Sequence, residues 1–412
     1  MTKSAIQLLV CLLVIAETTA MTYMLISPTD YYRSSSWLYF LCGIAISMFP
    51  LLGKVFTSKP STFKIWWLPI CAIPLFTAPL CYFLPTHFSK IEVYYKWADM
   101  LPRIQIYVER FLTGDYVYKP VTMWWGGVGL PPYLPAVWLP FIPSNVLGFD
   151  MRWTTVACYI VAMIIVLSQF KFRLSLLSII CFTLLFLGLL YLDYYLIHLG
   201  KGFWVFTYEG LIVLYYVLLL WALAKWKPFF IGFSIAICLL SRFSLVTWIP
   251  FFMLFLFVFE QPSFALKTAF AFLISVSLLF LLPFYIGHSE EFSHIIEQYR
   301  FGSINFWNLL KDNHQINMQG MHKMFGKSQY EFYKKLHLLF SVVAPFVFLF
   351  GLSLVFPNFR NRNRLIAMCS LKFTLVFFFC FIDMPFFYVF IPPTIISYMI
   401  AGWFISESNA LD

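Results

Sequence analysis

Residues that can carry out acid–base chemistry gather in one short stretch, residues 97–120 (WADMLPRIQIYVERFLTGDYVYKP), of an otherwise apolar chain. Its first carboxylate, Asp99, has two alternative uses. It can cap a helix that begins at Met100, with Pro102 tolerated in the first turn, or it can accept a proton from a hydroxyl group within hydrogen-bond reach. Spacing alone favours the cap, and the two roles are compatible.

Arginines offer the complementary chemistry, because a guanidinium binds a phosphate or carboxylate through two parallel hydrogen bonds. Arg242 stands between two short apolar runs, in the segment LLSRFSL, where an unpaired cation would be costly. It is therefore either a functional cation or a turn residue whose side chain reaches water. Arg300 and Arg103 are further candidates. Arg103 can instead pair with Asp99 one turn earlier, and each of the two can be a solvated surface charge.

The other titratable residues give weaker signals. Three reserve acids, which we interpret as solvated loop charges or helix caps, are Asp115, Asp150 and Glu209. The residues that could gather around a metal ion are His288 and His294, or Asp312, His314 and His322. None of these has a recognised ligand spacing, so the residues themselves predict no metal site. Glu17 and Lys372 fall inside apolar runs and can pair, cap backbone groups or reach an interface.

The segment that begins at Asp99 has the pattern of a surface helix. Its apolar residues recur at spacings of three and four, at Leu101, Ile104, Val108 and Phe111, and the charged residues fall between them. This pattern predicts an amphipathic helix over 100–113 that lies at a membrane surface and ends at Gly114.

The composition explains why such a segment stands out. Of 412 residues, 61% are hydrophobic and 11% charged, and the mean hydropathy is +0.82, whereas soluble domains carry roughly 25% charged residues. We therefore predict an all-α, polytopic membrane protein with one integral domain over 1–412. The net charge of +10 does not indicate nucleic-acid binding, because no basic stretch is interleaved with aromatic residues. The nine cysteines are scattered singly, which is typical of packing residues.

Apolar runs of about 17 to 25 residues predict about twelve transmembrane helices. They lie near 5–26, 37–53, 65–84, 153–170, 174–198, 209–224, 228–241, 243–259, 264–286, 337–356, 365–382 and 385–404. The first two form an N-terminal helical pair within 1–64, and two long polar loops, 85–152 and 287–336, interrupt the series. Residues 1–20 also have features of a signal peptide, and cleavage there would leave the downstream topology unchanged.

Basic residues predict the orientation of these helices. With a cytoplasmic N-terminus, the short cytoplasmic connections hold Lys54, Lys59, Lys64, Lys171, Arg173, Lys225, Lys227, Lys267, Arg360, Arg362 and Arg364. This agrees with the excess of lysine and arginine found in cytoplasmic loops. Both long loops, and all seven histidines in or beside external loops, then face the outside.

A loop rich in proline, glycine and tryptophan, WWGGVGLPPYLPAVWLPFIP (124–143), follows the predicted surface helix. It is too irregular for a helix and too aromatic for a disordered tether. We expect it to pack against the bilayer interface and the helix bundle.

The order of these features resembles the polytopic glycosyltransferases of the C superfamily (GT-C), which use polyprenyl-phosphate sugars. In that superfamily the first large external loop begins with an acidic residue and continues through a juxtamembrane amphipathic helix. The matching features are Asp99, the helix 100–113, Gly114-Asp-Tyr-Val-Tyr118, Pro132-Tyr-Leu-Pro135 and Arg300-Phe-Gly-Ser-Ile-Asn-Phe-Trp307. Two features depart from the pattern: a helical pair at 5–53 precedes the usual first helix, and Asp99 stands alone where some relatives have adjacent acids.

The resemblance implies an inverting enzyme that moves one sugar, most often mannose in the wider family, from a polyprenyl-phosphate donor to a glycan, lipid or protein acceptor. Its site would face outward from a bacterial inner membrane. Asp99 would be the general base. The residues implied to bind the donor phosphate are Arg242, Arg300 and Arg103. Those implied to line the sugar site or anchor the interface are Tyr118, Trp124, Trp125 and Tyr133. The lone Asp99 leaves open whether Mg²⁺ or Mn²⁺ is needed.

Two other classes of protein compete with this interpretation. About twelve helices with a few buried charges also suit a lipid-linked saccharide flippase or another transporter, but such proteins usually show repeated halves, which this chain lacks. An oligosaccharide polymerase is the second rival, because Arg300 lies in a large external loop. A membrane acyltransferase would require a catalytic histidine in an embedded site, whereas every histidine here lies in or beside an external loop.

Overall fold

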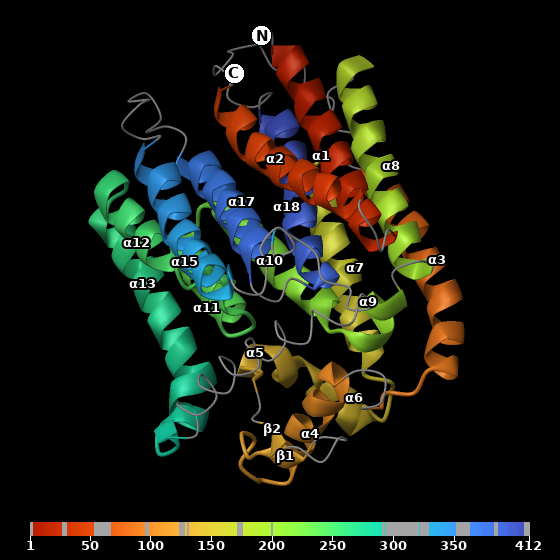
Figure 1. Ribbon diagram of the computed structural model, residues 1–412, viewed down its shortest axis with the longest axis vertical. Helices are drawn as coiled ribbons and strands as arrows, with labels where there is room; N and C mark the ends of the chain where they lie inside the picture. The colour runs from red at the N-terminus through yellow and green to blue at the C-terminus, as the bar shows by residue number, and fades with distance from the viewer. Residues whose placement is uncertain are drawn as a thin grey trace.

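The apolar runs form a helical bundle with a polar layer at one end (Figure 1), in a computed structural model of the chain. The structure describes residues 3–26, 31–52, 67–94, 99–122, 128–129, 132–170, 176–198, 201–290, 292, 321, 329–351, 363–382 and 386–407. The first elements are α1 (Lys3–Ile26), α2 (Tyr31–Leu52), α3 (Trp67–Lys90), α4 (Met100–Leu112), β1 (Val121–Thr122), β2 (Val128–Gly129), α5 (Pro135–Trp138), the 3-10 helix η1 (Leu139–Phe141), α6 (Ile142–Leu147), α7 (Arg152–Ser168) and α8 (Leu176–His198).

The remaining elements complete the bundle. They are α9 (Lys201–Phe206), α10 (Glu209–Lys225), α11 (Pro228–Leu239), the 3-10 helix η2 (Phe243–Leu245), α12 (Trp248–Phe259), α13 (Pro262–Val276), its π-helical continuation η3 (Ser277–Tyr285), α15 (Tyr330–Phe346), its π-helical continuation η6 (Val347–Gly351), α17 (Asn363–Phe381), the 3-10 helix η8 (Phe387–Phe390) and α18 (Ile391–Glu407). The two strands are two residues long and pair antiparallel, with Val121 opposite Gly129. The fold is therefore all-α, as predicted.

Each of the twelve predicted apolar runs corresponds to a helix. Eight helical segments in the described part of the chain are long and apolar enough to cross a bilayer. They are Ser4–Met24, Ser34–Leu51, Ile70–Lys90, Leu176–His198, Pro262–Tyr285, Tyr330–Gly351, Asn363–Phe381 and Phe387–Ile405. The chain is a multi-pass integral membrane protein.

The two runs on either side of Arg242 form a hairpin of half-length helices. With 12 residues each, α11 and α12 rise about 18 Å at about 1.5 Å per residue, well short of a hydrocarbon core of about 30 Å. Trp226, before α11, stacks on Phe264, after α12, with ring centroids 5.4 Å apart. The hairpin therefore enters and leaves the bundle at the same end, and its tip, residues 240–247, lies within the bundle.

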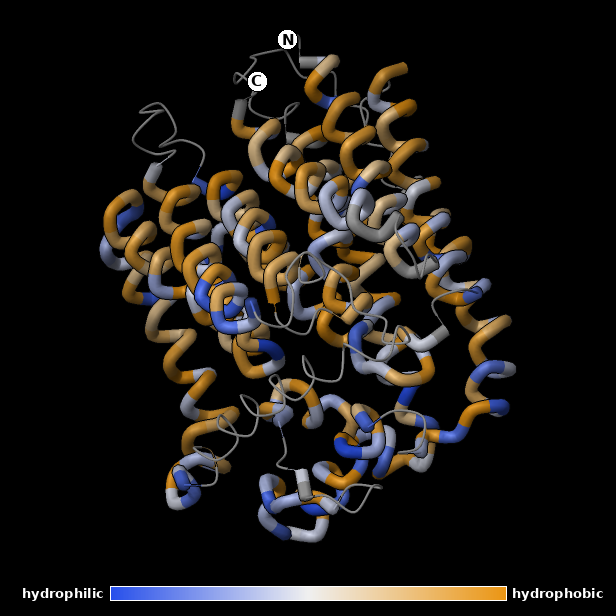
Figure 2. Tube along the Cα trace, viewed as in Figure 1, coloured by the Kyte–Doolittle hydropathy of each residue, from blue (hydrophilic) through white to orange (hydrophobic). Residues whose placement is uncertain are grey.

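The polar layer at the other end of the bundle is formed by the described residues of 99–147, which we call the lip (Figure 1). Hydrophilic residues gather in it and in the neighbouring ends of the helices (Figure 2). Tyr116 of the lip stacks on His288 at 3.8 Å between ring centroids, and Tyr118 meets Phe292 at 4.8 Å. These contacts confirm that the two long loops begin at the same end of the bundle.

Local sequence explains the helices of the lip. In α4 the residues Leu101, Ile104 and Val108 are buried, which confirms the predicted amphipathic helix, and Gly114 ends it with a left-handed φ of +73°. The prediction that 124–143 contains no helix was wrong for its second half, where α5, η1 and α6 follow one another. Each of these short helices has a proline in its first turn, where the missing N–H costs nothing.

A buried ion pair attaches the N-terminal helices to the rest of the bundle. Lys372 of α17 binds Glu17 of α1, and both side chains are fully buried. The other carboxylate oxygen of Glu17 accepts a hydrogen bond from Ser397 of α18 at 2.5 Å, and Lys372 Nζ also donates to the Pro393 carbonyl at 2.9 Å. Of the three alternatives that the sequence leaves open for Glu17 and Lys372, the structure shows pairing, which fixes α1 against α17 and α18.

Replacing only one partner of this pair should destabilise the protein strongly. Lys372→Met leaves the Glu17 carboxylate buried without a cation, which costs about 3–5 kcal/mol in comparable sites. We expect a clear fall in the unfolding temperature in detergent. The double variant Glu17→Leu/Lys372→Met should recover most of that loss, because no charge is left unpaired. A double variant that unfolds as early as the single one would contradict this account.

Candidate functional site

Asp99 lies at the start of α4 and pairs with Arg103 one turn later. Its Oδ2 is 2.8 Å from Arg103 Nη2, and the side chains are 42% and 14% exposed respectively. Although Asp99 occupies the N-cap position, its side chain makes no capping hydrogen bond. The side-chain cap that spacing favoured is therefore wrong, and the alternative pairing with Arg103 is the contact observed; the carboxylate remains partly accessible at the surface of the lip.

A second acid–base pair lies deeper, at the hairpin tip. Arg242 Nη2 binds Glu209 Oε1, the Glu209 side chain is fully buried, and that of Arg242 keeps 14% of its surface exposed. Arg242 also lies over the Phe379 ring, 5.7 Å from its centroid. The interpretation of Glu209 as a solvated loop charge was wrong, because it is the first residue of α10 and is covered by the bundle.

Helix lengths explain why these two residues meet. The 17 residues of α10 carry Glu209 about 25 Å from Lys225. The first helix of the hairpin, α11, begins three residues after Lys225 and runs back toward the Glu209 end of α10. It places the hairpin tip about 18 Å along that direction. Both side chains thus reach a similar depth, beneath the lip rather than at the outer surface.

Three tyrosines connect the surface pair with the buried pair. Tyr133 of the lip packs against Tyr208, which precedes α10, with ring centroids 5.3 Å apart. Burial raises the pKa of the Tyr133 hydroxyl, and Tyr208 and Asp99 add to that rise while Arg103 opposes it. Burial likewise raises the pKa of Tyr208, where Arg242 opposes the rise and Glu209 and Asp99 add to it. Tyr388 of η8 lies within electrostatic range of both carboxylates.

The predicted residues Asp99, Arg103, Tyr133 and Arg242 therefore belong to one cluster. We call it the tyrosine-linked site, and it comprises these four residues with Tyr208, Glu209 and Tyr388. Sequence analysis missed Tyr208 and Tyr388. Tyr208 adjoins an acid at the start of an apolar run, which is a weak signal, and Tyr388 stands in an aromatic segment with no distinguishing pattern.

Other predicted residues lie elsewhere. Tyr118 is fully buried, accepts a hydrogen bond from Trp138 Nε1 at 3.3 Å, and has a pKa raised by burial. These contacts favour a packing role within the lip. Asp115 is exposed and binds Lys119, which holds the pKa of the Asp115 carboxyl below its usual range. Asp150 binds Arg152 at 2.5 Å.

Several predicted residues lie outside the described part of the chain. They are Trp124, Trp125, Arg300, His294, Asp312, His314 and His322. Within the described part, no group of three or more histidine, cysteine, aspartate or glutamate side chains could hold a metal ion.

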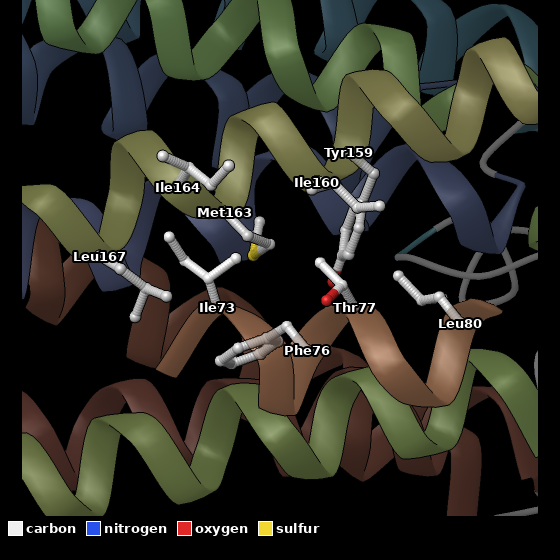
Figure 3. A pocket seen from close by; sticks show the side chains of 9 residues that line it. All are labelled: Ile73, Phe76, Thr77, Leu80, Tyr159, Ile160, Met163, Ile164 and Leu167. Atoms are coloured by element: carbon white, nitrogen blue, oxygen red, sulfur yellow. The ribbon is translucent and has the colours of Figure 1, made fainter. Parts of the chain in front are cut away.

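An apolar groove between α3 and α7 is separate from this cluster (Figure 3). It encloses about 220 Å³ of empty space, including its open mouth. Its lining residues are Ile73, Phe76, Thr77, Leu80, Tyr159, Ile160, Met163, Ile164 and Leu167. Without a charged residue, the groove offers hydrocarbon contact rather than chemistry.

Comparison of the chain with protein-family models, curated proteins and solved structures finds no match.

Asp99→Asn should leave the fold intact. The change removes a helical pair whose carboxylate is 42% exposed, and such surface pairs contribute about 0.3–0.5 kcal/mol. We expect the unfolding temperature in detergent to change by no more than about 2 °C. Lys372→Met, measured in parallel, shows that the method detects the loss of an important pair. A large fall for Asp99→Asn would show that Asp99 holds the lip together.

Proposed function

We propose that the chain is an inverting glycosyltransferase of the GT-C type. It would move a single sugar from a polyprenyl-phosphate donor to an acceptor hydroxyl outside a bacterial inner membrane. The observation that carries this proposal is the tyrosine-linked site, in which a surface carboxylate lies above a buried arginine–glutamate pair. Such a site suits a reaction between a water-borne acceptor and a lipid-borne donor.

The proposed reaction assigns one role to Asp99. The acceptor oxygen attacks the anomeric carbon from the face opposite the phosphate, so that a new C–O bond forms as the bond to the phosphate oxygen breaks. Asp99 takes the proton from the acceptor hydroxyl, and the electron pair of the broken bond leaves with polyprenyl phosphate. Arg103 holds the Asp99 carboxylate in place through their 2.8 Å contact.

The leaving phosphate needs positive charge. Arg103, whose side chain in the lip is 14% exposed, and Arg300, from the second long loop, are the proposed ligands of the donor phosphate. We assign no role to a metal ion: Asp99 binds a cationic side chain, and the described residues contain no group of three or more histidine, cysteine, aspartate or glutamate side chains that could hold one.

One observation favours a second candidate, a lipid-linked saccharide flippase. Transporters often place a charged binding site on interrupted helices near the middle of the membrane, and the half-length hairpin with Arg242 at its tip has that form. A flippase would move the intact donor across the bilayer, whereas the proposed enzyme would consume it. Measuring both donor consumption and donor translocation in the same proteoliposomes separates the two functions.

Asp99→Asn should lower sugar transfer by about 10²–10⁴-fold, because an amide cannot accept the proton. The assay supplies labelled polyprenyl-phosphate sugars to proteoliposomes with a glycan extract as acceptor, and it measures release of polyprenyl phosphate. Asp115→Asn is the matched control, since Asp115 pairs with a cation four residues later, Lys119, in the same lip. Full activity in Asp99→Asn, or equal loss in both variants, would refute the assignment of Asp99 as base. A parallel arm with chelator determines whether transfer needs a divalent metal ion.

The proposed outward-facing site predicts which surface reagents reach the lip. Asp115→Cys should react with a membrane-impermeant maleimide in intact cells, because Asp115 is exposed in the lip. Lys267→Cys, exposed on α13 at the other end of the bundle, should react only after the membrane is opened. The unmodified chain, with its nine cysteines in apolar runs, gives the background labelling. The reverse labelling pattern would place the site on the cytoplasmic side.

A further inference from the structure

The bundle contains two buried ion pairs that differ in one respect. In the Glu17–Lys372 pair, both carboxylate oxygens are hydrogen-bonded, one to Lys372 and one to Ser397, and the lysine also binds the Pro393 carbonyl. All its strong polar contacts are made within the protein. This pair is closed, as expected for a purely structural contact.

The Glu209–Arg242 pair is open. Among the described residues, neither Glu209 Oε2 nor Arg242 Nη1 has a hydrogen-bond partner of good geometry, although both atoms are buried; the Tyr208 hydroxyl lies close enough to interact with the Arg242 guanidinium. Polar atoms buried in this way usually have a partner, and each exception requires an explanation. The pair therefore offers one hydrogen-bond acceptor, Glu209 Oε2, and one donor, Arg242 Nη1, to a ligand.

The chemistry of these two atoms selects the ligand. A phosphate only accepts hydrogen bonds, and its charge would be repelled by Glu209. A hydroxyl group both donates and accepts, so it can donate to Glu209 Oε2 and accept from Arg242 Nη1. We propose that the Glu209–Arg242 pair binds hydroxyl groups of a sugar. That this sugar is the one carried by the donor rests on the proposed function.

The surroundings of the pair fit a sugar ring. The Phe379 ring lies 5.7 Å from Arg242, Tyr208 interacts with Arg242, and Tyr388 is within electrostatic range of the pair; aromatic side chains offer apolar faces with polar edges. The exposed 14% of Arg242 gives the pair a connection to the surface of the bundle. Tyr208 packs against Tyr133, which is within electrostatic range of Asp99, the proposed base.

This inference changes the role expected for Arg242. The sequence resemblance implies that Arg242 binds the donor phosphate, but the buried Glu209 carboxylate already neutralises its charge. A neutralised pair discriminates between hydroxyl patterns better than it attracts an anion. Arg242 is thus a specificity-determining residue, and phosphate binding stays with the arginines of the loops.

The test measures binding without turnover. The full-length chain in lipid nanodiscs is titrated with methyl α-D-mannoside, methyl α-D-glucoside and methyl α-D-galactoside, and separately with dodecyl phosphate, by saturation-transfer NMR. Glu209→Gln should weaken binding of the preferred glycoside at least tenfold. Its carbonyl oxygen can still accept from Arg242, while its amide nitrogen donates where Oε2 would accept. Dodecyl phosphate should bind as before.

A variant without either charge controls for misfolding of Glu209→Gln. Glu209→Leu/Arg242→Met removes both ions together, so neither is left unpaired, and it should also lose glycoside binding. Glu17→Leu/Lys372→Met, the same change in the closed pair, should bind glycoside within twofold of the unmodified chain.

Three results would overturn the inference. They are loss of dodecyl phosphate binding with glycoside binding retained, equal effects of the two double variants, and no glycoside binding by the unmodified chain. If glycoside binds as expected but no donor is consumed, the proposed function fails and the sugar site stands.

Discussion

The cost of placing charge inside an apolar bundle governs this structure. Although the chain has few charged residues, its described part places two ion pairs inside the bundle, because an unpaired buried ion would be far more expensive than a pair. One pair joins α1 to α17 and the other joins α10 to the hairpin tip. Helices distant in the sequence are thus held at defined depths, and the position of the candidate site follows from those depths.

The cost of burying charge also distinguishes an ion pair that only stabilises the fold from one that can bind a ligand. A pair whose hydrogen bonds are all made inside the protein can be exchanged for apolar residues of similar volume at little cost. A pair that leaves a donor and an acceptor open is less stable than it could be. Proteins retain such locally destabilising features mainly at sites where binding of a ligand offsets the lost stability. Glu209 and Arg242 have this character, and Glu17 and Lys372 do not.

Much of the fold could be predicted from the sequence. Every apolar run became a helix, because in lipid a helix is the one local structure that satisfies its own backbone, and α4 followed from apolar residues spaced three and four apart. The helices α5, η1 and α6 were missed because proline was taken as a sign of irregular structure rather than as a first-turn residue.

The candidate site could be predicted only in part. Asp99 and Arg103 are one helical turn apart, so their contact follows from local geometry. The contact between Glu209 and Arg242 spans 33 positions, and it depends on where a hairpin turns and where α10 begins. The residue types of Glu209 and Arg242 do not indicate how deep in the bundle either side chain lies. Tyr388 reaches the site from η8 near the other end of the chain, and no local pattern marks it.

The half-length hairpin also bears on a side reaction. An activated sugar at a membrane surface meets water far more often than it meets any chosen acceptor, so hydrolysis competes with transfer. In the proposed enzyme, a hairpin tip that ends beneath the lip would draw the sugar below the aqueous boundary, where water is scarce, and entry would pass the carboxylate of Asp99. In the proposed enzyme, the shortness of α11 and α12 would then determine how much donor is wasted.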